Sequence, residues 1–422
     1  MQLCGKVTSK PSESSMHRPW IVIRQPPSVH ISVEEDLSFC DSDSMKLLAQ
    51  LLASLMLLAL TGTGNADARL SLAPGFSIET LPFAVPNARQ MALTDAGALI
   101  VGTRKKGRVY AVVNPFTDNP RVITLIKGLK MPSGVAVVGS DLYVAATSTV
   151  YKVANIDQQL QPNPTTTVIT DALPNKRHHG WKYLKAGPDG QLYLPVGAPC
   201  NVCLSDDPRF ATMLRMDPET GATEIIGHGI RNSVGFDWQP GRGDLWVSNN
   251  GRDMMGDDIP SDEINVIPAA SEKAPHYGYP FIHSAPDGSR IKDPKFGDHP
   301  AAQSLTFVDP AIRVQAHAAV LGMSFYRGER FPAPFQDALF VAEHGSWNRS
   351  KKVGYQVSVA TFGTNGQPNY QPFITGWLKG ENAWGRPNDV LPTPDGALLI
   401  SDDKAGVIYR VTANPTALAL AP

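Results

Sequence analysis

Short alternations of apolar and polar residues, each introduced by a glycine- or aspartate-containing turn, recur six times along the chain. Three of the apolar runs are "DAGALIVGT" from Asp95, "PDGQLYLPVG" from Pro188 and "PDGALLISDD" from Pro394. The other three begin at Gly139, Gly241 and Phe335. Alternation with a period of two residues predicts β-strands, because successive side chains of a strand point to opposite faces.

Each apolar run has a strand-like neighbour on both sides. "RQMALT" and "GRVYAVV" flank the first run, and "NDVLPT" and "GVIYRVT" flank the last. Each set forms an antiparallel meander that is too small to bury both of its faces alone. Six such units bury their faces best when they stack radially around one axis. We therefore predict an all-β protein, a six-bladed β-propeller of four-stranded antiparallel blades. A chain of two domains is the alternative.

One interval between successive turns, from Gly243 to Asp337, is much longer than the others. It contains "PAASEKAPHYGYPFIHSAPDGSRIKDPKFGDHP", which is rich in proline, glycine and aspartate. We interpret this segment as a long functional loop and not as a seventh blade.

The segment "MKLLAQLLASLMLLALTGTGNADA", residues 45–68, departs from the strand pattern. A lysine, an apolar run and then small residues predict a secretory signal peptide, whose apolar core is short for a membrane span. A retained transmembrane anchor is the alternative. We therefore expect residues 1–44 to be a non-native or disordered extension, residues 69–414 to be the propeller and residues 415–422 to be a tail. The mature protein is then periplasmic or secreted.

The net charge limits which classes of partner are expected, and the cysteines limit which redox chemistry is expected. A formal net charge of -1 over 422 residues gives no basic field for nucleic acid, so a small molecule or a protein is the expected partner. Two cysteines, Cys200 and Cys203, lie within the predicted propeller. They lack the second cysteine pair of a zinc site and the adjacent histidine that covalent haem requires. In an exported protein a disulfide is favoured over a redox motif.

The predicted fold brings distant residues together at one end of the central channel. The first strand of every propeller blade lines that channel, so the residues at its start lie at one mouth. Superposing the six repeats places there Arg89 and Gln90, Pro132 and Ser133, His178 and His179, Arg231 and Asn232, His317, and Arg386. Three enlarged loops, "GAPCNVCLSDDPRF", "NNGRDMMGDDIPS" and "EHGSWNRSKK", reach the same face. Loop growth on one face predicts a binding face.

This set of side chains indicates a site for an anion and a cation, because charged groups are costly to bury without partners. Arg231 and Arg386 are suited to clamp carboxylates. The backbone carbonyls of "NNGRD" offer oxygen ligands for calcium, as do the carboxylates of Asp257, Asp258, Asp262 and Glu263. A solvated acidic loop and a structural arginine are the alternatives.

Several motifs resemble the glucose/sorbosone dehydrogenase family, most closely its L-sorbosone dehydrogenase-like members. They are "HHGWKYLKAGPDGQLYLPVGAPCNVC", "GIRNSVGFDW", "NNGRDMMGDDIPSDEIN", "AEHGSWNRS" and "WGRPNDV" followed by "PDGALLISDD". The resemblance runs from about Arg69 to Thr412. It implies a six-bladed propeller that carries pyrroloquinoline quinone and calcium and oxidises a sugar hydroxyl, a hydrated aldose or a sugar-derived aldehyde.

The resemblance also implies roles for individual residues. His179 matches the general base, while Arg231, Asn232, Arg386, His317 and Arg349 match positions that contact the cofactor or its surroundings. Gly251 and Arg252 match the carbonyls that hold the cofactor's calcium, and Asp262 with Glu263 matches a structural calcium segment. Residues expected at the substrate or behind the site are His178, Gln90, Asp257 and Asp258. Compared with the soluble glucose dehydrogenases, His178 replaces an acidic residue, Arg252 a proline and His317 a hydroxyl residue.

The chain lacks the C-x-x-C-H motif of a covalently attached haem, so we expect electrons to leave to an external cytochrome or quinone. A homodimer is compatible with this scheme.

Two other functions fit the same architecture: a calcium-dependent lactonase or esterase, and a non-catalytic carbohydrate-binding propeller. The arginine-rich channel mouth favours the quinone enzyme, because a lactonase needs no anion clamps.

Overall fold

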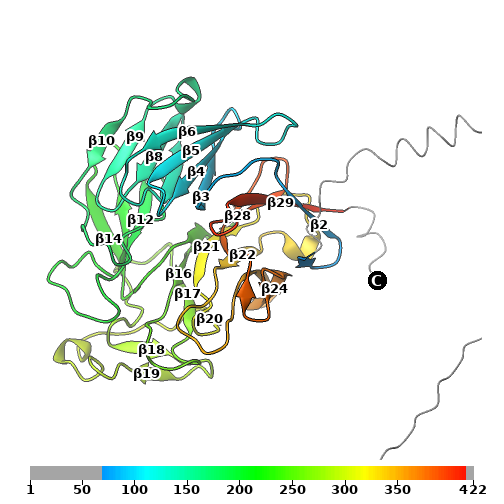
Figure 1. The fold of residues 1–422 in the computed structure, drawn as a ribbon. Helices are drawn as coiled ribbons and strands as arrows, with labels where there is room; N and C mark the ends of the chain where they lie inside the picture. Colours follow the sequence, from blue (N-terminus) through cyan, green and yellow to red (C-terminus); the bar gives the residue numbers. More distant parts are fainter. Residues whose placement is uncertain (1–68, 415–422) are drawn as a thin grey trace, which may run out of the picture. The chain divides into compact units, whose positions relative to one another are not determined.

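Residues 69–414 are described by the structure, a computed structural model, and they form six blades around a central channel (Figure 1). The six-bladed propeller predicted from the turn repeats is therefore confirmed. The predicted extension, signal peptide and C-terminal tail lie outside the described residues.

Each blade is an antiparallel meander whose innermost strand comes first in the chain. Blade 1 contains β3 (Ala88–Leu93), β4 (Leu99–Thr103), β5 (Arg108–Val113) and β6 (Arg121–Lys127). Blade 2 contains β7 (Gly134–Val138), β8 (Asp141–Ala145), β9 (Val150–Val153) and β10 (Thr167–Thr170). Blade 3 contains β11 (Lys185–Ala186), β12 (Leu192–Val196), β13 (Thr212–Met216) and β14 (Thr223–His228).

The remaining blades follow the same order, with the outer strands partly taken from elsewhere in the chain. Blade 4 contains β15 (Phe236–Trp238), β16 (Leu245–Asn249), β17 (Asp262–Ile267) and β20 (Ile312–Val314). Blade 5 contains β21 (Val320–Phe325), β22 (Leu339–Glu343), β23 (Gln356–Phe362), β24 (Pro368–Thr375) and the short β1 (Ser71–Leu72). Blade 6 contains β27 (Pro387–Pro392), β28 (Leu398–Asp402), β29 (Val407–Ala413) and β2 (Phe76–Thr80).

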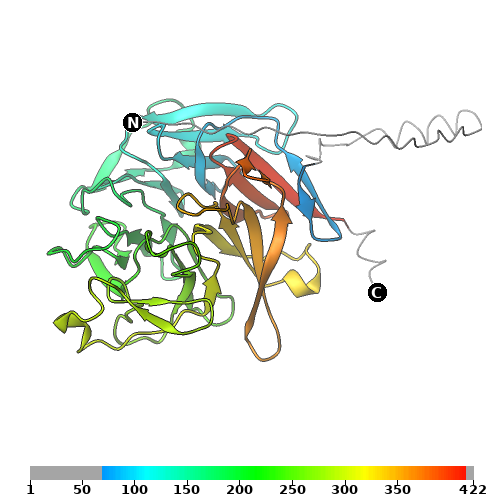
Figure 2. The same cartoon turned by 60° about the horizontal axis from the view of Figure 1, so that its bottom comes forward.

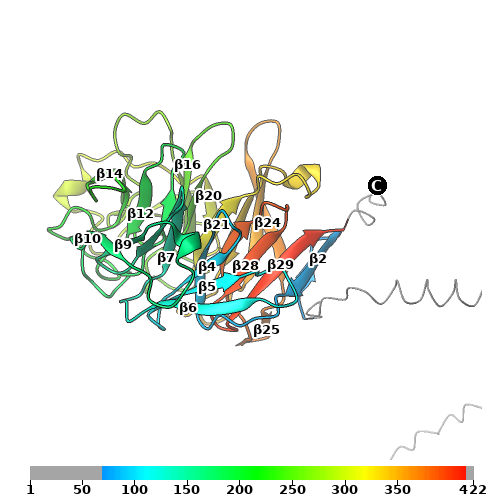
Figure 3. The same ribbon diagram turned by 90° about the horizontal axis from the view of Figure 1, so that it is seen from above.

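Strands from the two ends of the described chain close the ring. The early strand β2 pairs antiparallel with the last strand, β29, with Ile78 opposite Val411. Seen from above, the strands of blade 1 lie beside those of blade 6, and β3 contacts β27 (Figure 3). Ring closure leaves the six innermost strands facing one another around the channel.

Apolar side chains fill the spaces between blades. Ile100 and Val109 of blade 1 belong to the same buried cluster as Val135 and Val144 of blade 2. Equivalent clusters join the other neighbouring blades. Because each meander buries its two faces against its neighbours, the blades depend on one another for stability.

The long interval between the fourth and fifth repeats is an insertion inside blade 4 and not a seventh blade. It lies between β17 and β20 and carries a hairpin, β18 (Ile282–Ser284) and β19 (Arg290–Lys292), and a 3-10 turn, η2 (Pro300–Ala302) (Figure 2). Other small elements are η1 (Ile156–Gln158), η3 (Ala333–Phe335), β25 (Leu378–Lys379) and β26 (Asn382–Ala383). Within residues 69–414 no helix is long and apolar enough to cross a membrane.

We expect Ile78→Ala to destabilise the whole propeller, because Ile78 is buried on the strand that closes the ring. Truncating a buried isoleucine to alanine costs about 2–5 kcal/mol. Urea unfolding followed by far-UV circular dichroism measures the loss. Ser77→Ala, on the exposed face of the same strand, is the control and should change the unfolding free energy by less than about 0.5 kcal/mol. Equal effects of the two variants would show that ring closure does not depend on this contact.

Candidate active site

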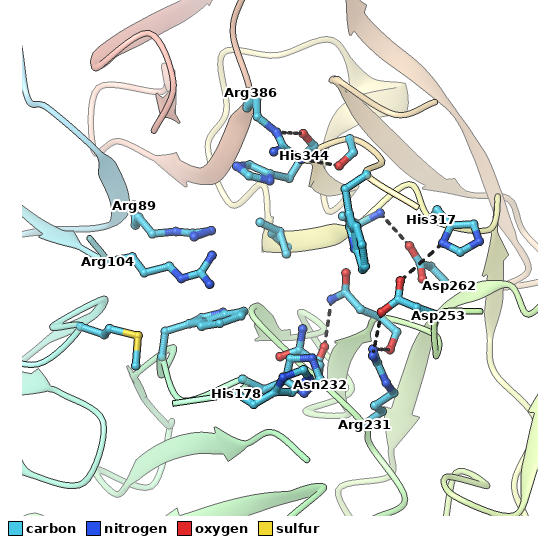
Figure 4. A pocket seen from close by; sticks show the side chains of 18 of the residues that line it. Arg89, Arg104, His178, Arg231, Asn232, Asp253, Asp262, His317, His344 and Arg386 are labelled. Carbon is cyan, nitrogen blue, oxygen red and sulfur yellow. Dashed lines mark hydrogen bonds and ion pairs between the residues drawn. The ribbon is translucent and has the colours of Figure 1, made fainter. Parts of the chain in front are cut away.

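A cavity of about 980 Å³ opens at the channel mouth, where the sequence places the binding face. All six blades, or the loops that lead into them, contribute to its wall (Figure 4). The polar side chains around it include Arg89 and Arg104 from blade 1, His178 and His179 before blade 3, Arg231, Asn232, Asp253 and Asp262 from blade 4, His317 and His344 from blade 5, and Arg386 from blade 6.

His179 is held with one ring nitrogen bonded and the other free. Its Nδ1 lies 2.9 Å from the carbonyl oxygen of Ala198, which can only accept, so Nδ1 carries the hydrogen. Nε2 has no hydrogen-bond partner among residues 69–414 and is left as an acceptor. Burial lowers the pKa of His179 well below 6.5, and the nearby positive charge of Arg231 lowers it further. The ring is therefore neutral at pH 7.

Backbone geometry explains why two glycines, one next in the chain and one across from it, lie against this histidine. His179 has a φ of 47°, in the left-handed region, and Gly180 follows it. A Cβ on Gly180 would lie 2.1 Å from the carbonyl oxygen of Lys176. A Cβ on Gly197 would lie 2.5 Å from the Cβ of His179. The strained turn and both glycines bring the imidazole against β12.

His178 lies beside His179 but in a different environment. The two rings are edge to face, with centroids 4.1 Å apart. His178 is exposed, and partial burial with the charge of Arg231 lowers its pKa. Its side chain makes no hydrogen bond to the described residues, so it lines the cavity without a fixed partner.

Arg231 uses all of its donors inside the protein. Its Nη1 donates to the carbonyl oxygens of Gly251 at 2.7 Å and Asn250 at 3.1 Å. Its Nη2 lies 3.1 Å from a carboxylate oxygen of Asp253, and further bonds reach Asn201. The side chain is almost fully buried. Arg231 therefore ties loops together at the cavity wall and has no free N–H for the carboxylate clamp predicted from the sequence. The neighbouring Asn232 lines the cavity, and its side-chain amide has no hydrogen-bond partner among residues 69–414.

The Gly251 carbonyl and the Asp262 carboxylate, which the resemblance assigns to two different calcium ions, both have hydrogen-bond partners in the protein. The Gly251 carbonyl accepts from Arg231, and both carboxylate oxygens of Asp262 accept backbone N–H groups, from Gly251 at 2.8 Å and Ala319 at 2.7 Å. Burial raises the pKa of Asp262 to about 7. Within residues 69–414 no three His, Cys, Asp or Glu side chains cluster as a metal site.

The Glu263 carboxylate and the Arg252 guanidinium have protein partners as well. Glu263 follows Asp262 on β17, so its side chain points to the opposite face, where it accepts from Ser284 at 2.6 Å and Asn249 at 2.9 Å. The Arg252 guanidinium pairs with Asp293 at 2.6 Å. The ligand expected from Arg252 is its backbone carbonyl and not the guanidinium, so calcium binding by these residues stays a prediction.

The other predicted residues lie at different distances from the cavity. Gln90 lies outside its lining: its side chain bonds the backbones of Val135 and Leu184 and so joins three blades. Asp257, Asp258 and Arg349 also lie outside, where Arg349 joins the blade 4 and blade 5 loops through a 2.8 Å ion pair with Asp258. His317 lines the cavity, and its pKa is raised by Asp253, whose carboxylate oxygen lies 3.7 Å from Nδ1.

Arg89, which the superposed repeats place at the channel mouth, lines the cavity together with two residues that were not predicted, Arg104 and His344. Buried Arg89 has no hydrogen-bond partner at Nε or Nη1, although Nη1 lies 3.5 Å from Asp403. Arg104 stacks on Trp181, 3.7 Å above the ring centroid, and burial lowers its pKa to about 10. His344 bonds Asp403 through Nε2 at 2.8 Å.

The repeat itself contains the signal that identifies two of these residues. The residue that directly follows the second strand of each blade is, in chain order, Arg104, Ala146, Gly197, Asn250, His344 and Asp403. Four of the six carry polar or charged side chains at the same face. The ends of the second strands, when superposed like the starts of the first strands, therefore predict this second ring of polar residues around the channel mouth.

More cationic than anionic side chains line the cavity. Besides Arg231, six cationic side chains line it, of which Arg252 pairs with Asp293: Arg89, Arg104, Lys105, Arg177, Arg252 and Arg386. The carboxylates in the lining are Asp253 and Asp262, and both are bonded within the protein. Because unpartnered buried guanidinium donors are costly, the donor set fits a small ligand that carries several carboxylates.

Comparisons with known proteins agree with this geometry. A family model described as TrAA12-like matches residues 216–414. An uncharacterized protein from Borreliella burgdorferi is 32% identical over 356 residues, which cover 81% of this chain and 90% of that protein. A pyrroloquinoline quinone-dependent sugar dehydrogenase from Hypocrea jecorina is 26% identical over 290 residues, or 58% of this chain and 63% of that protein.

Solved structures share the fold at lower identity. The iodide structure of the Trichoderma reesei Carbohydrate-Active Enzymes Family AA12 protein matches with a TM-score of 0.70 and 21% identity, covering 84% of this chain and 100% of that chain. The holo form of the pyranose dehydrogenase PQQ domain from Coprinopsis cinerea matches with a TM-score of 0.67 and 18% identity, covering 81% and 97%. The chain therefore belongs to the TrAA12-like family of pyrroloquinoline quinone-dependent sugar oxidoreductases.

Proposed function

We propose that the protein oxidises a sugar or a sugar-derived aldehyde, of the aldose or sorbosone type, by hydride transfer to pyrroloquinoline quinone. One observation carries the proposal: a neutral imidazole with an unbonded Nε2 lies in the same cavity as buried guanidinium donors that lack partners. The first group suits a hydroxyl substrate, and the second suits a cofactor with several carboxylates.

Arg89, Arg104 and Arg386 are the residues that would hold the cofactor's carboxylates, with the amide of Asn232 as a further donor. Arg386 is itself positioned by its bond to the His344 carbonyl oxygen at 2.8 Å. Arg104 is positioned by its stacking on Trp181. When bound, the quinone supplies the acceptor for the two electrons and the hydrogen that leave the substrate carbon.

His179 would accept the substrate hydroxyl proton at Nε2. Nδ1–H already donates to the Ala198 carbonyl oxygen, so this bond orients the ring and strengthens as the imidazolium forms. Burial and Arg231 keep the ring neutral before the reaction. The exposed indole of Trp347 at the cavity wall offers an apolar surface for one face of a sugar ring.

Calcium at the backbone carbonyls of Gly251 and Arg252 stays a prediction, and reconstitution with and without added calcium tests it. The reduced cofactor would pass its electrons to an external acceptor. Export to the periplasm or outside the cell rests on the apolar segment of residues 45–68 and remains a prediction, as does a homodimer.

Reconstitution tests the function directly. Purified protein is mixed with pyrroloquinoline quinone, with and without added calcium, and dye reduction is followed with a panel of aldoses and sorbosone. We expect a quinone absorption band and sugar-dependent dye reduction. Lactone hydrolysis without quinone would instead support a lactonase, and sugar binding without either activity would support a binding module.

We expect His179→Gln to lower turnover at least about a hundredfold, since general-base assistance contributes about a hundred- to ten-thousandfold. Cofactor affinity should stay within about twofold of the parent protein, because His179 is not among the proposed cofactor ligands. His178→Gln, which changes the adjacent exposed ring, is the matched control and should lower turnover less. Near-normal turnover of His179→Gln would reject His179 as the base.

The rate should depend on pH through neutral His179. Burial and Arg231 lower the pKa of His179 below 6.5, so the base form persists at pH 7 and is lost only as the pH falls through the lowered value. We expect kcat/KM to be flat near neutrality and to decline with one proton on the acid side, at an apparent pKa below 6.5. An acid limb centred above 6.5 contradicts this assignment.

We expect Arg104→Met to weaken cofactor binding about ten- to a hundredfold, the effect of losing one charge-assisted contact. The long apolar side chain keeps contact with Trp181, so unfolding should change little. Titration of quinone into the protein, followed by tryptophan quenching, gives the affinity. Arg121→Met, on an exposed outer strand, removes the same charge and should leave affinity unchanged. Equal affinities for the parent and Arg104→Met would remove Arg104 from the binding site.

A further inference from the structure

A four-residue disulfide ring lies directly behind the cavity wall. Cys200 and Cys203 are joined in the loop between β12 and β13, and the ring contains Asn201 and Val202. Tyr279, from the insertion in blade 4, holds the ring: its hydroxyl accepts the Cys203 backbone N–H at 3.1 Å and lies 3.7 Å from the Cys200 sulfur. The ring is partly exposed to solvent.

Asn201 makes four hydrogen bonds from this ring to two residues of the cavity wall. Its backbone oxygen accepts from Arg231 Nε at 2.8 Å, and its Oδ1 accepts from Arg231 Nη2 at 2.9 Å. Oδ1 also accepts the backbone N–H of Asp253 at 2.9 Å, and Nδ2 donates to the Asp253 carbonyl oxygen at 3.0 Å. Both polar ends of the side chain and the main-chain oxygen are thus committed to Arg231 and Asp253.

These hydrogen bonds determine the positions of the charged side chains of Arg231 and Asp253 in the cavity wall. Arg231, once fixed, donates to the carbonyls of Asn250 and Gly251, and its charge lies close enough to lower the pKa of His179. Asp253, once fixed, pairs with Arg231 at 3.1 Å and faces His317 at 3.7 Å. A contact from blade 3 therefore organises groups that belong to blades 4 and 5.

We propose that Asn201 is a positioning residue for Arg231 and Asp253, and that the Cys200–Cys203 disulfide makes this possible by restricting the Asn201 backbone. A disulfide that closes so few residues restricts the unfolded chain much less than one that closes a long loop, so its main effect is local geometry. The effect on catalysis rests on the proposed function, whereas the ordering of the wall does not.

Reduction of the disulfide should therefore loosen the cavity wall. A dithiol such as dithiothreitol supplies two electrons and two protons, which break the S–S bond and leave the thiols of Cys200 and Cys203, while the dithiol closes to its own cyclic disulfide. The partly exposed ring is open to attack. Asn201 then gains backbone freedom, and its four bonds to the wall become weaker.

Hydrogen–deuterium exchange of the full chain tests this ordering without cofactor or substrate. We expect peptides that cover residues 249–258 to exchange at least about tenfold faster after reduction, in the Cys200→Ser/Cys203→Ser variant and in Asn201→Ala. Asn201→Asp keeps both acceptor positions, so Arg231 stays bound and the increase should be smaller. Peptides of β4 and β28, on the far side of the channel, are the internal control.

Enzymatic readouts separate positioning from a general loss of stability. In Asn201→Ala, Arg231 is held less firmly near His179, so the pKa of His179 should rise toward 6.5. The acid limb of the kcat/KM profile should therefore move to higher pH. A protein that is only less stable would keep the acid limb of the parent protein. Unchanged exchange at residues 249–258 in Asn201→Ala and in the reduced protein would overturn the proposal. Absence of quinone binding by the parent protein would instead count against the proposed function alone, because the exchange result stands independently.

Discussion

Pairing between β2 and β29 closes the ring, and the rest of the structure depends on that closure. Without it, blade 6 would lack its outer strand and expose an unpaired edge. With it, the six innermost strands form a continuous wall around the channel. Buried polar side chains then join strands that are far apart in the chain: Asp389 accepts from the backbone of Met91 at 2.8 Å and from Tyr183 at 3.1 Å. Gln90 joins blades 1, 2 and 3 in the same way.

The closed ring concentrates charge that is dispersed in the sequence. The whole chain is nearly neutral, yet the channel mouth collects guanidinium groups from blades 1, 4 and 6. The protein satisfies some of them internally, as with Arg231 and Arg252, and leaves others, such as Arg89, with unpartnered donors. The difference separates arginines that build the wall from arginines that are available to a ligand. Burial acts in the same place on His179, because it removes the solvation that would favour the charged imidazole.

Much of the fold and part of the site could be predicted from the sequence. The period-two alternation and the regular turns predict the six blades, and the position of His179 in its repeat predicts its place at the channel mouth. The same reasoning missed Arg104 and His344, because only the starts of the first strands were superposed. It also assigned Arg231 a free guanidinium, since the partners of a side chain come from loops whose paths the sequence pattern does not determine. Asp262 and Glu263 are adjacent in sequence, but their side chains point to opposite faces of β17.

The sequence by itself determined the number of blades, the three consecutive strands of each repeat and the face on which the loops grow, because alternation and turn chemistry act over a few residues. Only the tertiary structure decided which polar atoms remain unpaired at the channel mouth. Hydrogen bonds such as those that Arg231 donates to Asn201 join residues of different blades, and their existence depends on distances set by the closed ring. A pattern of residue types shows which groups reach the site, and the packed structure shows which of them are still free to bind.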